Sequence, residues 1–478
     1  MRRVSVPRVT EERDAQDEGD LRKLGYAQQL RRAMGGFSNF ALSFSVISIL
    51  TGAVTLYGDG LKNGGPLVMS VGWPLVTLLT LPIAASLAEL ASAYPTAGAL
   101  YHWASILGGP SWGFFTAWLN TLGQFAITAG IDYGVAVFLA PMLGFPADRQ
   151  HVLSIYAIVL TSHAVLNHVG VRAVSILNIV SAWWHVFGVL LLVVALAFAP
   201  RHPIGFLFER FTTQPRGYGY GFAIGLLQAA FTFTGYDASA HVGEETHDPR
   251  RNAPRGIFWS VVVSGVAGLV MLLMVTIAIP DLPSTLAADN AFIDVLVRAL
   301  GQRLGAVLLW IVIAAMWFAG LSSVTSNSRM LFAFARDGGL PFSSRIALVS
   351  KRFRTPHVAV WVSVVAAFTL AWWAKAYNAV VALSTIALYA SYALPIVALM
   401  RARRRGRTLE RGPWHLGRWS TTLNALAVSW VAVATVLFVL PPNELAGITF
   451  FGALVALTLY WFLYMRSRFA GPRLALLT

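Results

Sequence analysis

One stretch decides the fold: Phe231-Thr232-Phe233-Thr234-Gly235-Tyr236-Asp237-Ala238-Ser239-Ala240-His241-Val242-Gly243-Glu244-Glu245-Thr246. It begins inside an apolar run long enough to cross a bilayer, and it contains a glycine between β-branched and aromatic residues, followed by a carboxylate. An ionised Asp at mid-membrane costs about 2.5–3.5 kcal/mol, so such a residue faces protein or water instead of lipid. We predict that this helix unwinds near Thr234 and Gly235, which frees backbone N–H and C=O groups to hold a small polar solute.

Composition places the whole chain in a membrane. Of the 478 residues, 56% are apolar and only 12% are charged. The formal charge of +15 lies in short segments between apolar runs, whereas a nucleic-acid-binding protein would need a basic face on a soluble fold. The chain has no cysteine, no phosphate-binding loop and no nucleophile-elbow motif. We therefore predict no enzyme, no cofactor, no metal centre and no nucleic-acid partner.

Apolar segments of about 20 residues, the length that crosses a bilayer as a helix, recur along the chain. We predict an all-α membrane protein with twelve transmembrane helices in the cytoplasmic membrane. The predicted spans are 37–57, 66–91, 112–139, 152–168, 174–199, 220–240, 256–280, 305–335, 357–374, 377–400, 421–440 and 445–465.

Basic residues predict the orientation of these spans. Most of the 36 Lys and Arg residues fall in segments that twelve spans place on one side, including the Arg-rich run 401–418. Cytoplasmic loops carry such an excess, so we predict that both termini are cytoplasmic, with residues 1–36 and 467–478 as tails. The run 401–418 is also compatible with contact to anionic lipid.

The first span carries a second candidate interruption, at Thr51-Gly52 within the hydroxyl-rich segment 43–53. Ser and Thr in membrane helices often bond back to their own backbone, so a slightly bent ordinary helix is the alternative. Corresponding glycine interruptions in the first and sixth spans favour a transporter site between two inverted repeats.

Other polar residues inside spans are candidates for lining or coupling. Gln124 is expected near mid-depth, and His185 has the one side chain that ordinarily titrates near neutrality; a structural role is the alternative for both. A hydroxyl cluster in the eighth span offers oxygens to a small cation such as sodium, although helix packing also explains it: Ser322, Ser323, Thr325 and Ser326. Glu244 and Glu245 precede a loop with Arg250, in which carboxylates and guanidiniums could pair into a gate; a merely solvated loop is the alternative.

Four segments together carry a family resemblance: 36–40 with 51–52 and 64–66, then 88–103, 233–254 and 328–341. The chain resembles an amino acid permease of the amino acid-polyamine-organocation superfamily, most closely the amino acid/choline transporter branch that includes GABA and choline permeases. The resemblance implies the five-plus-five inverted-repeat fold typified by the leucine transporter. Residues 37–199 and 200–400 would form the two repeats, and residues 401–466 two further helices.

The resemblance also implies a binding site. The substrate carboxylate would meet the N–H groups of Leu50, Thr51, Gly52 and Ala53, while the rest of the substrate lies against Phe231, Thr234, Gly235, Tyr236 and Asp237. Relatives carry a Lys seven residues after an Asn in the fifth span, where it replaces a sodium ion. Here Asn178 is followed at that spacing by His185, which makes His185 the candidate for proton coupling.

The functional hypothesis is a secondary active transporter that imports an amino acid or related small amine, such as GABA, by alternating access, coupled to protons. Within the transporters, the alternatives are a choline or quaternary-amine permease and a sodium-coupled transporter. The alternative of another class is a membrane channel or receptor without coupled turnover.

Overall fold

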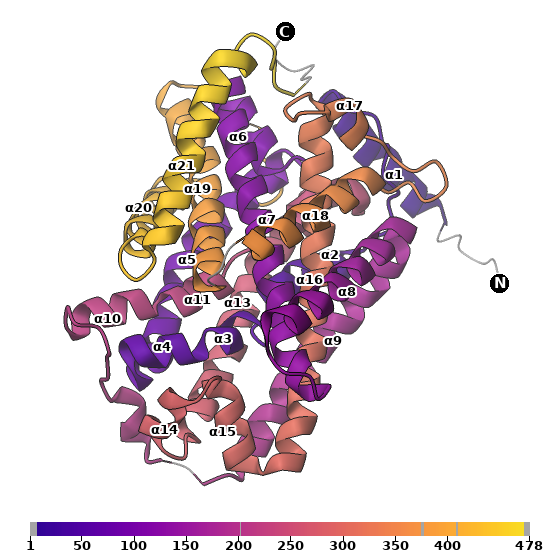
Figure 1. Ribbon diagram of the computed structural model, residues 1–478. Helices are drawn as coiled ribbons and strands as arrows, with labels where there is room; N and C mark the ends of the chain where they lie inside the picture. The colour runs from indigo at the N-terminus through magenta and orange to yellow at the C-terminus, as the bar shows by residue number, and fades with distance from the viewer. Residues whose placement is uncertain (1–6, 201, 374–376, 408–409, 473–478) are drawn as a thin grey trace, which may run out of the picture.

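The computed structural model describes residues 7–200, 202–373, 377–407 and 410–472, and in these residues it is a bundle of helices (Figure 1). No β-strand occurs in these ranges, and an isolated parallel bridge joins Met34 to Thr246. The outer ends of both predicted tails, 1–6 and 473–478, and residue 374 of the ninth predicted span lie outside the described residues.

The first part of the chain forms one long helix for each predicted span except the first, which is broken. Its elements are α1 (Pro7–Lys23), α2 (Gly36–Ile47), α3 (Gly52–Thr55), α4 (Tyr57–Gly64), η1 (Val68–Gly72), α5 (Trp73–Ala93), α6 (Leu100–Gly108), α7 (Pro110–Met142), α8 (Arg149–Val169) and α9 (Val171–Ala197).

The second part repeats this pattern with a broken sixth span. Its elements are η2 (Ile204–Phe208), α10 (Tyr218–Gly225), α11 (Leu227–Thr232), α12 (Ala238–His241), η3 (Gly243–Glu245), α13 (Pro249–Ile277), α14 (Leu282–Ala287), α15 (Ala291–Leu300), α16 (Gln302–Arg336), α17 (Ser343–Ile346), α18 (His357–Trp373), α19 (Tyr377–Arg404), η4 (Gly417–Trp419), α20 (Ser420–Val439), α21 (Glu444–Tyr460) and η5 (Trp461–Met465).

Ten helical segments of the described chain are long and apolar enough to cross a membrane; one is the broken segment Gly36–Thr55, and some others join an α-helix to the short helix beside it, as in Glu444–Met465. The prediction of an all-α, multi-pass membrane protein is therefore confirmed. α18, with 17 residues, is shorter than these ten, and the sixth predicted span is divided among the short helices α10, α11 and α12. Twelve crossings remain a prediction.

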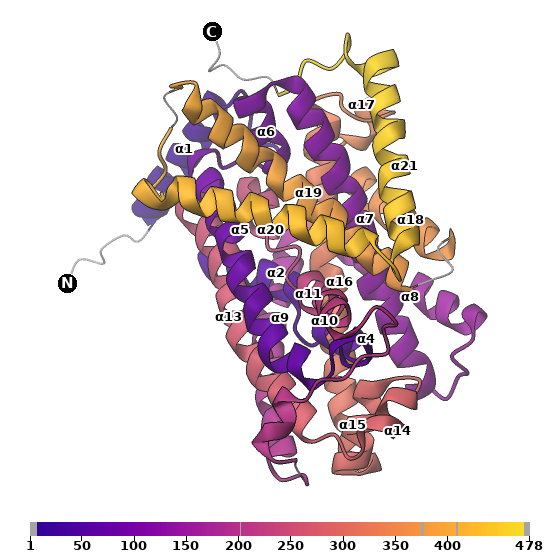
Figure 2. The ribbon, with the colours of Figure 1, turned by 90° about the vertical axis from the view of Figure 1, so that its left-hand side faces the viewer.

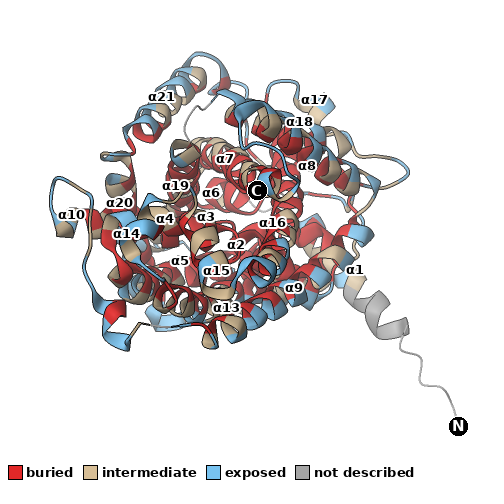
Figure 3. Ribbon diagram, turned by 60° about the horizontal axis from the view of Figure 1, so that its bottom comes forward, coloured by how far each residue is buried: buried red, intermediate tan, exposed pale blue. Residues whose placement is uncertain are grey.

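The long helix α7 runs through the middle of the bundle and packs against α19, α16, α8 and α18 (Figures 1 and 2). α5 packs against α13, and α2 packs against both α13 and α9. Buried residues concentrate on the faces that these helices turn inward, whereas α9 and α21 expose large apolar side chains outward, as lipid-facing helices do (Figure 3). α20 and α21 cover the outside of the bundle over α5 and α19.

The two ends of the bundle are distinguished by their short helices. α1, α6 and α17 lie at one end, which we call the α6 end, and α14 and α15 lie at the opposite end, the α15 end (Figures 1 and 2).

The predicted N-terminal tail contains a docked helix, which the sequence analysis did not anticipate. Three acids of α1 spaced three apart share one helix face and meet the segment that follows α12. Asp14 contacts His247 at 2.7 Å, the Asp17 carboxylate accepts from the backbone N–H of Asp248 at 2.9 Å, and Asp20 lies 3.6 Å from Arg250. These contacts hold α1 against the α6 end.

Candidate functional site

The first span is interrupted at residues 48–51, which we call the first break. α2 ends at Ile47, and Ser48 adopts a left-handed conformation with φ 31°. The N–H groups of Thr51 and Gly52 both donate to the Ser48 carbonyl, which closes a tight turn before α3 begins. The predicted interruption at Thr51-Gly52 is confirmed.

The sixth span is interrupted at residues 233–237, the second break. α11 ends at Thr232, α12 begins at Ala238, and Gly235 lies between them with φ +80°, a conformation that costs a residue with a Cβ free energy. The Thr234 hydroxyl donates to the Phe231 carbonyl at 2.6 Å and closes the end of α11. Unwinding near Thr234 and Gly235 is also confirmed.

The two breaks lie against each other. A Cβ on Gly52 would lie 2.8 Å from the Thr232 Cα, so only glycine permits this approach of the backbones. Gln228 of α11 donates to the Ala53 carbonyl at 2.8 Å, and Ser43 of α2 donates to the Tyr236 carbonyl at 2.7 Å. Side chains on both sides of the breaks therefore fix the unwound segments relative to one another.

Several backbone groups in the breaks have no protein partner among the described residues. The N–H groups of Leu50 and Ala53 donate to no protein atom there, and the same holds for those of Thr234 and Tyr236. Of the predicted four-residue cradle, Leu50 and Ala53 thus retain free N–H groups, while Thr51 and Gly52 use theirs within the turn. Free N–H groups in a broken helix can bind the carboxylate of a small solute.

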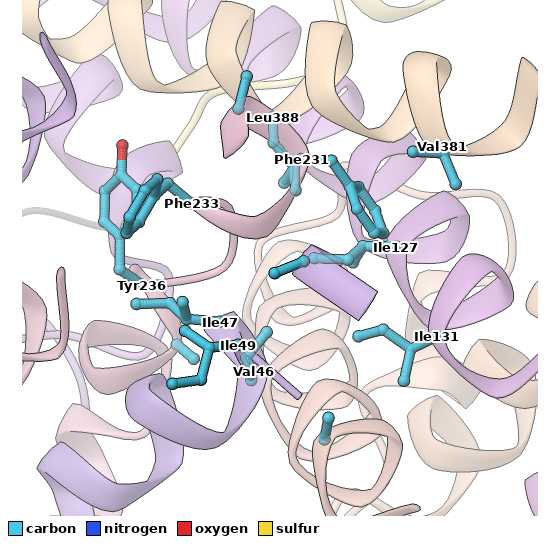
Figure 4. Packing of buried hydrophobic residues seen from close by; sticks show 14 of the residues in the cluster. Val46, Ile47, Ile49, Ile127, Ile131, Phe231, Phe233, Tyr236, Val381 and Leu388 are labelled. Atoms are coloured by element: carbon cyan, nitrogen blue, oxygen red, sulfur yellow. The ribbon is translucent and has the colours of Figure 1, made fainter. Parts of the chain in front are cut away.

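One side of the second break is apolar. Figure 4 shows Phe231 beside Ile127 and Val381, with Phe233 and Tyr236 on the other side of the unwound segment. A Cβ placed on Gly130 of α7 would lie 3.7 Å from the Phe231 ring, so this glycine keeps the space beside the ring clear. The predicted site residues Phe231 and Tyr236 are therefore separated.

Asp237 is fully buried, and side chains occupy both of its oxygens. Oδ1 accepts from the Tyr392 hydroxyl at 2.8 Å, while Oδ2 lies 3.2 Å from the Asn120 amide nitrogen and 3.1 Å from His241 Nε2. The Tyr392 oxygen in turn accepts from the Gly235 N–H at 2.9 Å. Asp237 therefore braces the unwound backbone through Tyr392.

Replacing Tyr392 by Phe should destabilise the protein, because it leaves the buried Asp237 oxygen and the Gly235 N–H without a partner. We expect a loss of about 1–3 kcal/mol, the cost of an unsatisfied buried polar group, seen as a lower thermal midpoint of the purified protein. Tyr133→Phe is the matched control, because no hydrogen bond of its hydroxyl occurs in the described residues. Equal midpoints for the two variants would show that the brace contributes nothing.

His185 contacts the first break. Its Nε2 lies 2.7 Å from the Ser48 hydroxyl, which is also 2.6 Å from the Thr51 hydroxyl, and its Nδ1 donates to the Ser181 carbonyl at 2.8 Å. The ring thus ties α9 to the turn at Ser48. The sequence placed His185 near the site but did not identify Ser48 as its partner.

The hydroxyls proposed as a weak sodium site have separate partners. Ser322 donates to Asn178, Ser323 pairs with Thr128, Thr325 donates to Asn167, and Ser326 accepts from Gln124. They thus link α16 to three other helices, α7, α8 and α9, as helix-packing hydrogen bonds do. Gln124 keeps its Oε1 buried and unpaired beside this cluster. No group of three or more His, Cys, Asp or Glu side chains suited to a metal occurs in the described ranges.

Two buried ion pairs join the segment after α12 to α16 near the α6 end. Arg329 binds Glu245 through two hydrogen bonds of 2.9 and 3.1 Å, and both side chains are fully buried. Arg336 binds Glu244 in the same two-pronged way, at 3.0 and 2.9 Å. The predicted pairing of Glu244 and Glu245 with guanidiniums is found, but the partners come from α16 instead of the neighbouring loop.

Glu244 stays ionised over the ordinary pH range. Burial alone would raise the pKa of this carboxyl, but the Arg336 guanidinium and the Ala97 N–H hold its pKa below the ordinary value of 4.5. A carboxyl with a depressed pKa stabilises the fold at neutral pH and loses this contribution as the pH falls below about 4.5.

We therefore expect the difference in thermal midpoint between the wild type and Glu244→Gln to be constant from neutrality down to about pH 5 and to shrink at lower pH. The measurement is thermal unfolding of both proteins across this range. A difference that changed between neutral and mildly acidic pH would contradict the assignment.

Several residues of the site were missed by the sequence analysis. Tyr392 and His241 complete the Asp237 network, while Asn39, Ser43 and Ser239 bond α2 to α12. Their polarity within apolar spans was the available signal. The sequence does not show which of many such residues meet.

Comparison with known proteins shows the family of this chain. The profile of the amino acid permease family matches residues 34–463. The chain is 37% identical over 500 residues to "Amino-acid permease BAT1" of Arabidopsis thaliana, covering 95% of each chain. It is 36% identical over 494 residues to "Amino-acid permease BAT1 homolog" of Oryza sativa subsp. japonica, covering 95% of this chain and 94% of that one. It is 27% identical over 460 residues to "GABA-specific permease" of Saccharomyces cerevisiae, covering 90% and 79%.

Two broken helices bonded together inside a bundle of apolar helices fit a multi-pass membrane protein. The relatives are named permeases, which are transporters and not enzymes. This chain belongs to the amino acid permease family.

Proposed function

We propose that the chain imports an amino acid or a related small amine, such as GABA, by proton-coupled alternating access. The observation that carries the proposal is the contact between the two breaks: the first contains N–H groups of Leu50 and Ala53 that have no partner in the described residues, and the second follows α11, which carries Phe231. The N–H groups would take the carboxylate, and the apolar surface would take the hydrocarbon part. GABA enters as a candidate because one relative is named a GABA-specific permease.

We further propose twelve crossings arranged as two inverted five-helix repeats followed by α20 and α21. In such a repeat each helix of the first half has an equivalent in the second half, so contacts should occur in equivalent pairs. The contact of α2 with α9 is matched by that of α11 with α19, and the contact of α7 with α19 is matched by that of α16 with α9. The contacts of α5 with α13 and of α7 with α16 each join a helix to its own equivalent in the other half.

The α6 end is proposed to face the cytoplasm. The Arg-rich segment that follows α19 begins there, as expected for cytoplasmic loops. The two buried ion pairs and docked α1 would then form the closed cytoplasmic gate of the transporter.

The ammonium of a substrate is not expected to bind Asp237, because both oxygens of that carboxylate are already occupied. We propose Gln124 Oε1 and the Phe233 carbonyl for it, neither of which has a partner among the residues that the structure describes. His185 remains the candidate that the sequence named for coupling, acting on the first break through Ser48.

The test has two stages. Purified protein is screened by thermal shift against amino acids, GABA, polyamines and choline, because only ligands that bind the native state stabilise it. The stabilising compounds are then assayed for uptake into proteoliposomes with an imposed proton gradient. We expect saturable uptake that a protonophore abolishes, whereas flux insensitive to proton and sodium gradients would contradict coupled transport.

A further inference from the structure

A cavity of about 700 Å³ lies at the α6 end, between the last turns of α5 and α19 and the start of α20. Neither the first nor the second break contributes a residue to its wall. The wall is rich in side chains that carry charge or an imidazole ring: Glu89, Arg403, Arg407, Glu410, Arg411 and His415. The cavity is therefore a polar space separate from the site at the breaks.

The side of the cavity that leads into α20 is held in place by α5. Glu89 of α5 accepts from the Leu416 N–H at 3.1 Å, and the Ser92 hydroxyl accepts from the Trp414 N–H at 3.0 Å. A Cβ on Gly412 would lie 2.4 Å from the Ser92 carbonyl carbon, so the chain passes directly over the end of α5. These contacts fix the wall before any ligand arrives, as in most small-molecule sites.

The two acids of the wall already have cationic partners. Glu89 lies 3.1 Å from Arg403 and also accepts from the Ser420 hydroxyl at 2.8 Å. The Glu410 carboxylate lies 3.8 Å from Arg250 of α13. Neither acid is therefore left to neutralise the other two arginines of the cavity.

Those two arginines are Arg407 and Arg411, which are exposed and line the cavity. Among the side chains that the structure describes, no acid lies within ion-pair distance of either one. Arg407 reaches the Leu107 carbonyl at 3.5 Å, which leaves its charge uncompensated. A guanidinium offers forked N–H donors that match the oxygens of a phosphate group, and two of them beside one cavity favour such an anion.

We propose that this cavity binds the phosphate group of an anionic ligand through Arg407 and Arg411, the phosphate being carried by a phospholipid headgroup or supplied as a soluble phosphate. The bound phosphate would compensate the two guanidiniums and tie the segment after α19 to the wall that α5 holds. The proposal concerns a second binding site and is independent of the proposed function.

The surroundings of the cavity give a lipid headgroup access to it. Trp419 is exposed beside the start of α20, with the Arg418 guanidinium 5.4 Å from the centre of its ring. Exposed tryptophans at the ends of membrane helices are typical of the membrane–water interface. Farther along α20, Leu426, Val433 and Val436 are exposed and offer an apolar surface to acyl chains.

Binding is measured on the purified full-length protein in a neutral detergent, as the rise of its thermal midpoint with added ligand. The probes are dioleoyl phosphatidylglycerol, dioleoyl phosphatidylcholine, and sodium phosphate compared with sodium chloride at equal ionic strength. We expect a saturable rise with phosphatidylglycerol or with sodium phosphate that exceeds the effect of phosphatidylcholine or of chloride. A rise with phosphatidylglycerol alone assigns the site to a lipid headgroup, and a rise with sodium phosphate assigns it to a soluble phosphate.

Arg407→Gln combined with Arg411→Gln should weaken the binding by roughly tenfold or more, because the charge-assisted hydrogen bonds to the phosphate are lost. Arg404→Gln combined with Arg405→Gln is the matched control. It removes the same charge from exposed residues of the same run that do not line the cavity, so the affinity should change by less than about threefold. Each shift is taken relative to the same variant without ligand, which separates binding from any change in stability.

Native mass spectrometry gives a second measurement that does not depend on thermal unfolding. If the ligand is phosphatidylglycerol, the wild type and R404Q/R405Q should retain it at collision energies that strip it from R407Q/R411Q. Equal weakening of binding by the two double variants would show only a diffuse attraction between charges and would overturn the site. Equal effects of phosphatidylglycerol and phosphatidylcholine without an effect of sodium phosphate, or the absence of any saturable rise, would overturn it as well.

Discussion

Gly235→Ala is expected to abolish most of the uptake. Gly235 has φ +80°, and a Cβ there would lie 2.2 Å from Val46 Cγ1 of α2. The left-handed conformation alone costs a residue with a Cβ about 1–2 kcal/mol, and relief of the clash must move the second break away from α2. Both effects displace the Gly235 N–H from the Tyr392 oxygen, so we expect uptake to fall by roughly tenfold or more.

The matched control for this variant is Gly219→Ala in α10, because a Cβ at Gly219 meets no heavy atom within 4 Å. Initial rates of uptake into proteoliposomes, normalised to folded protein, give the comparison. If G235A transported as fast as G219A, the unwound conformation at this glycine would be irrelevant to the transport cycle.

Arg329→Met is expected to cause the largest loss of stability. Met approximates the volume of the side chain but leaves the fully buried Glu245 carboxylate without its partner. Breaking a buried ion pair by removing one partner costs about 3–5 kcal/mol. Thermal unfolding of the purified protein should therefore show a markedly lower midpoint, because a carboxylate cannot be rehydrated at this position without opening the α6 end.

Two further variants distinguish the unpaired charge from lost packing as the cause of this loss of stability. Glu245→Gln combined with Arg329→Met removes the charge as well as its partner and should recover much of the midpoint, because the two residues act as one unit. Arg345→Met at an exposed position of α17 should leave the midpoint nearly unchanged. A double variant no more stable than R329M would show that packing, and not the unpaired charge, caused the loss.

Several features of the site were predictable because their causes are local. Gly235 needs a positive φ, and hydroxyl groups beside Gly52 compete for backbone hydrogen bonds, so both breaks could be predicted from short segments. The apolar spans follow from the same kind of local information, because each polar group placed in lipid adds its own free-energy cost.

Other features could not be predicted, because several orientations of the side chains are equally compatible with the sequence. Tyr236 was expected to share a surface with Phe231, but its ring packs 5.0 Å from Tyr392, on the other side of the break. An unwound segment has no fixed periodicity, so spacing along the chain does not determine which side chains share a face. The expected tail likewise contains α1, whose acids are held by partners more than 200 residues away.

The sequence by itself determined that the chain crosses a membrane repeatedly, that its first and sixth spans unwind, and which family it resembles. Each of these properties depends on the free energy of placing a residue or short segment in lipid or in a given backbone conformation. Only the tertiary structure decided that Asp237 pairs with His241 and Tyr392, and that Glu245 pairs with Arg329, 84 positions away. The stability of such pairs depends on the distance and orientation of atoms that packing brings together, and this information is absent from the order of the residues.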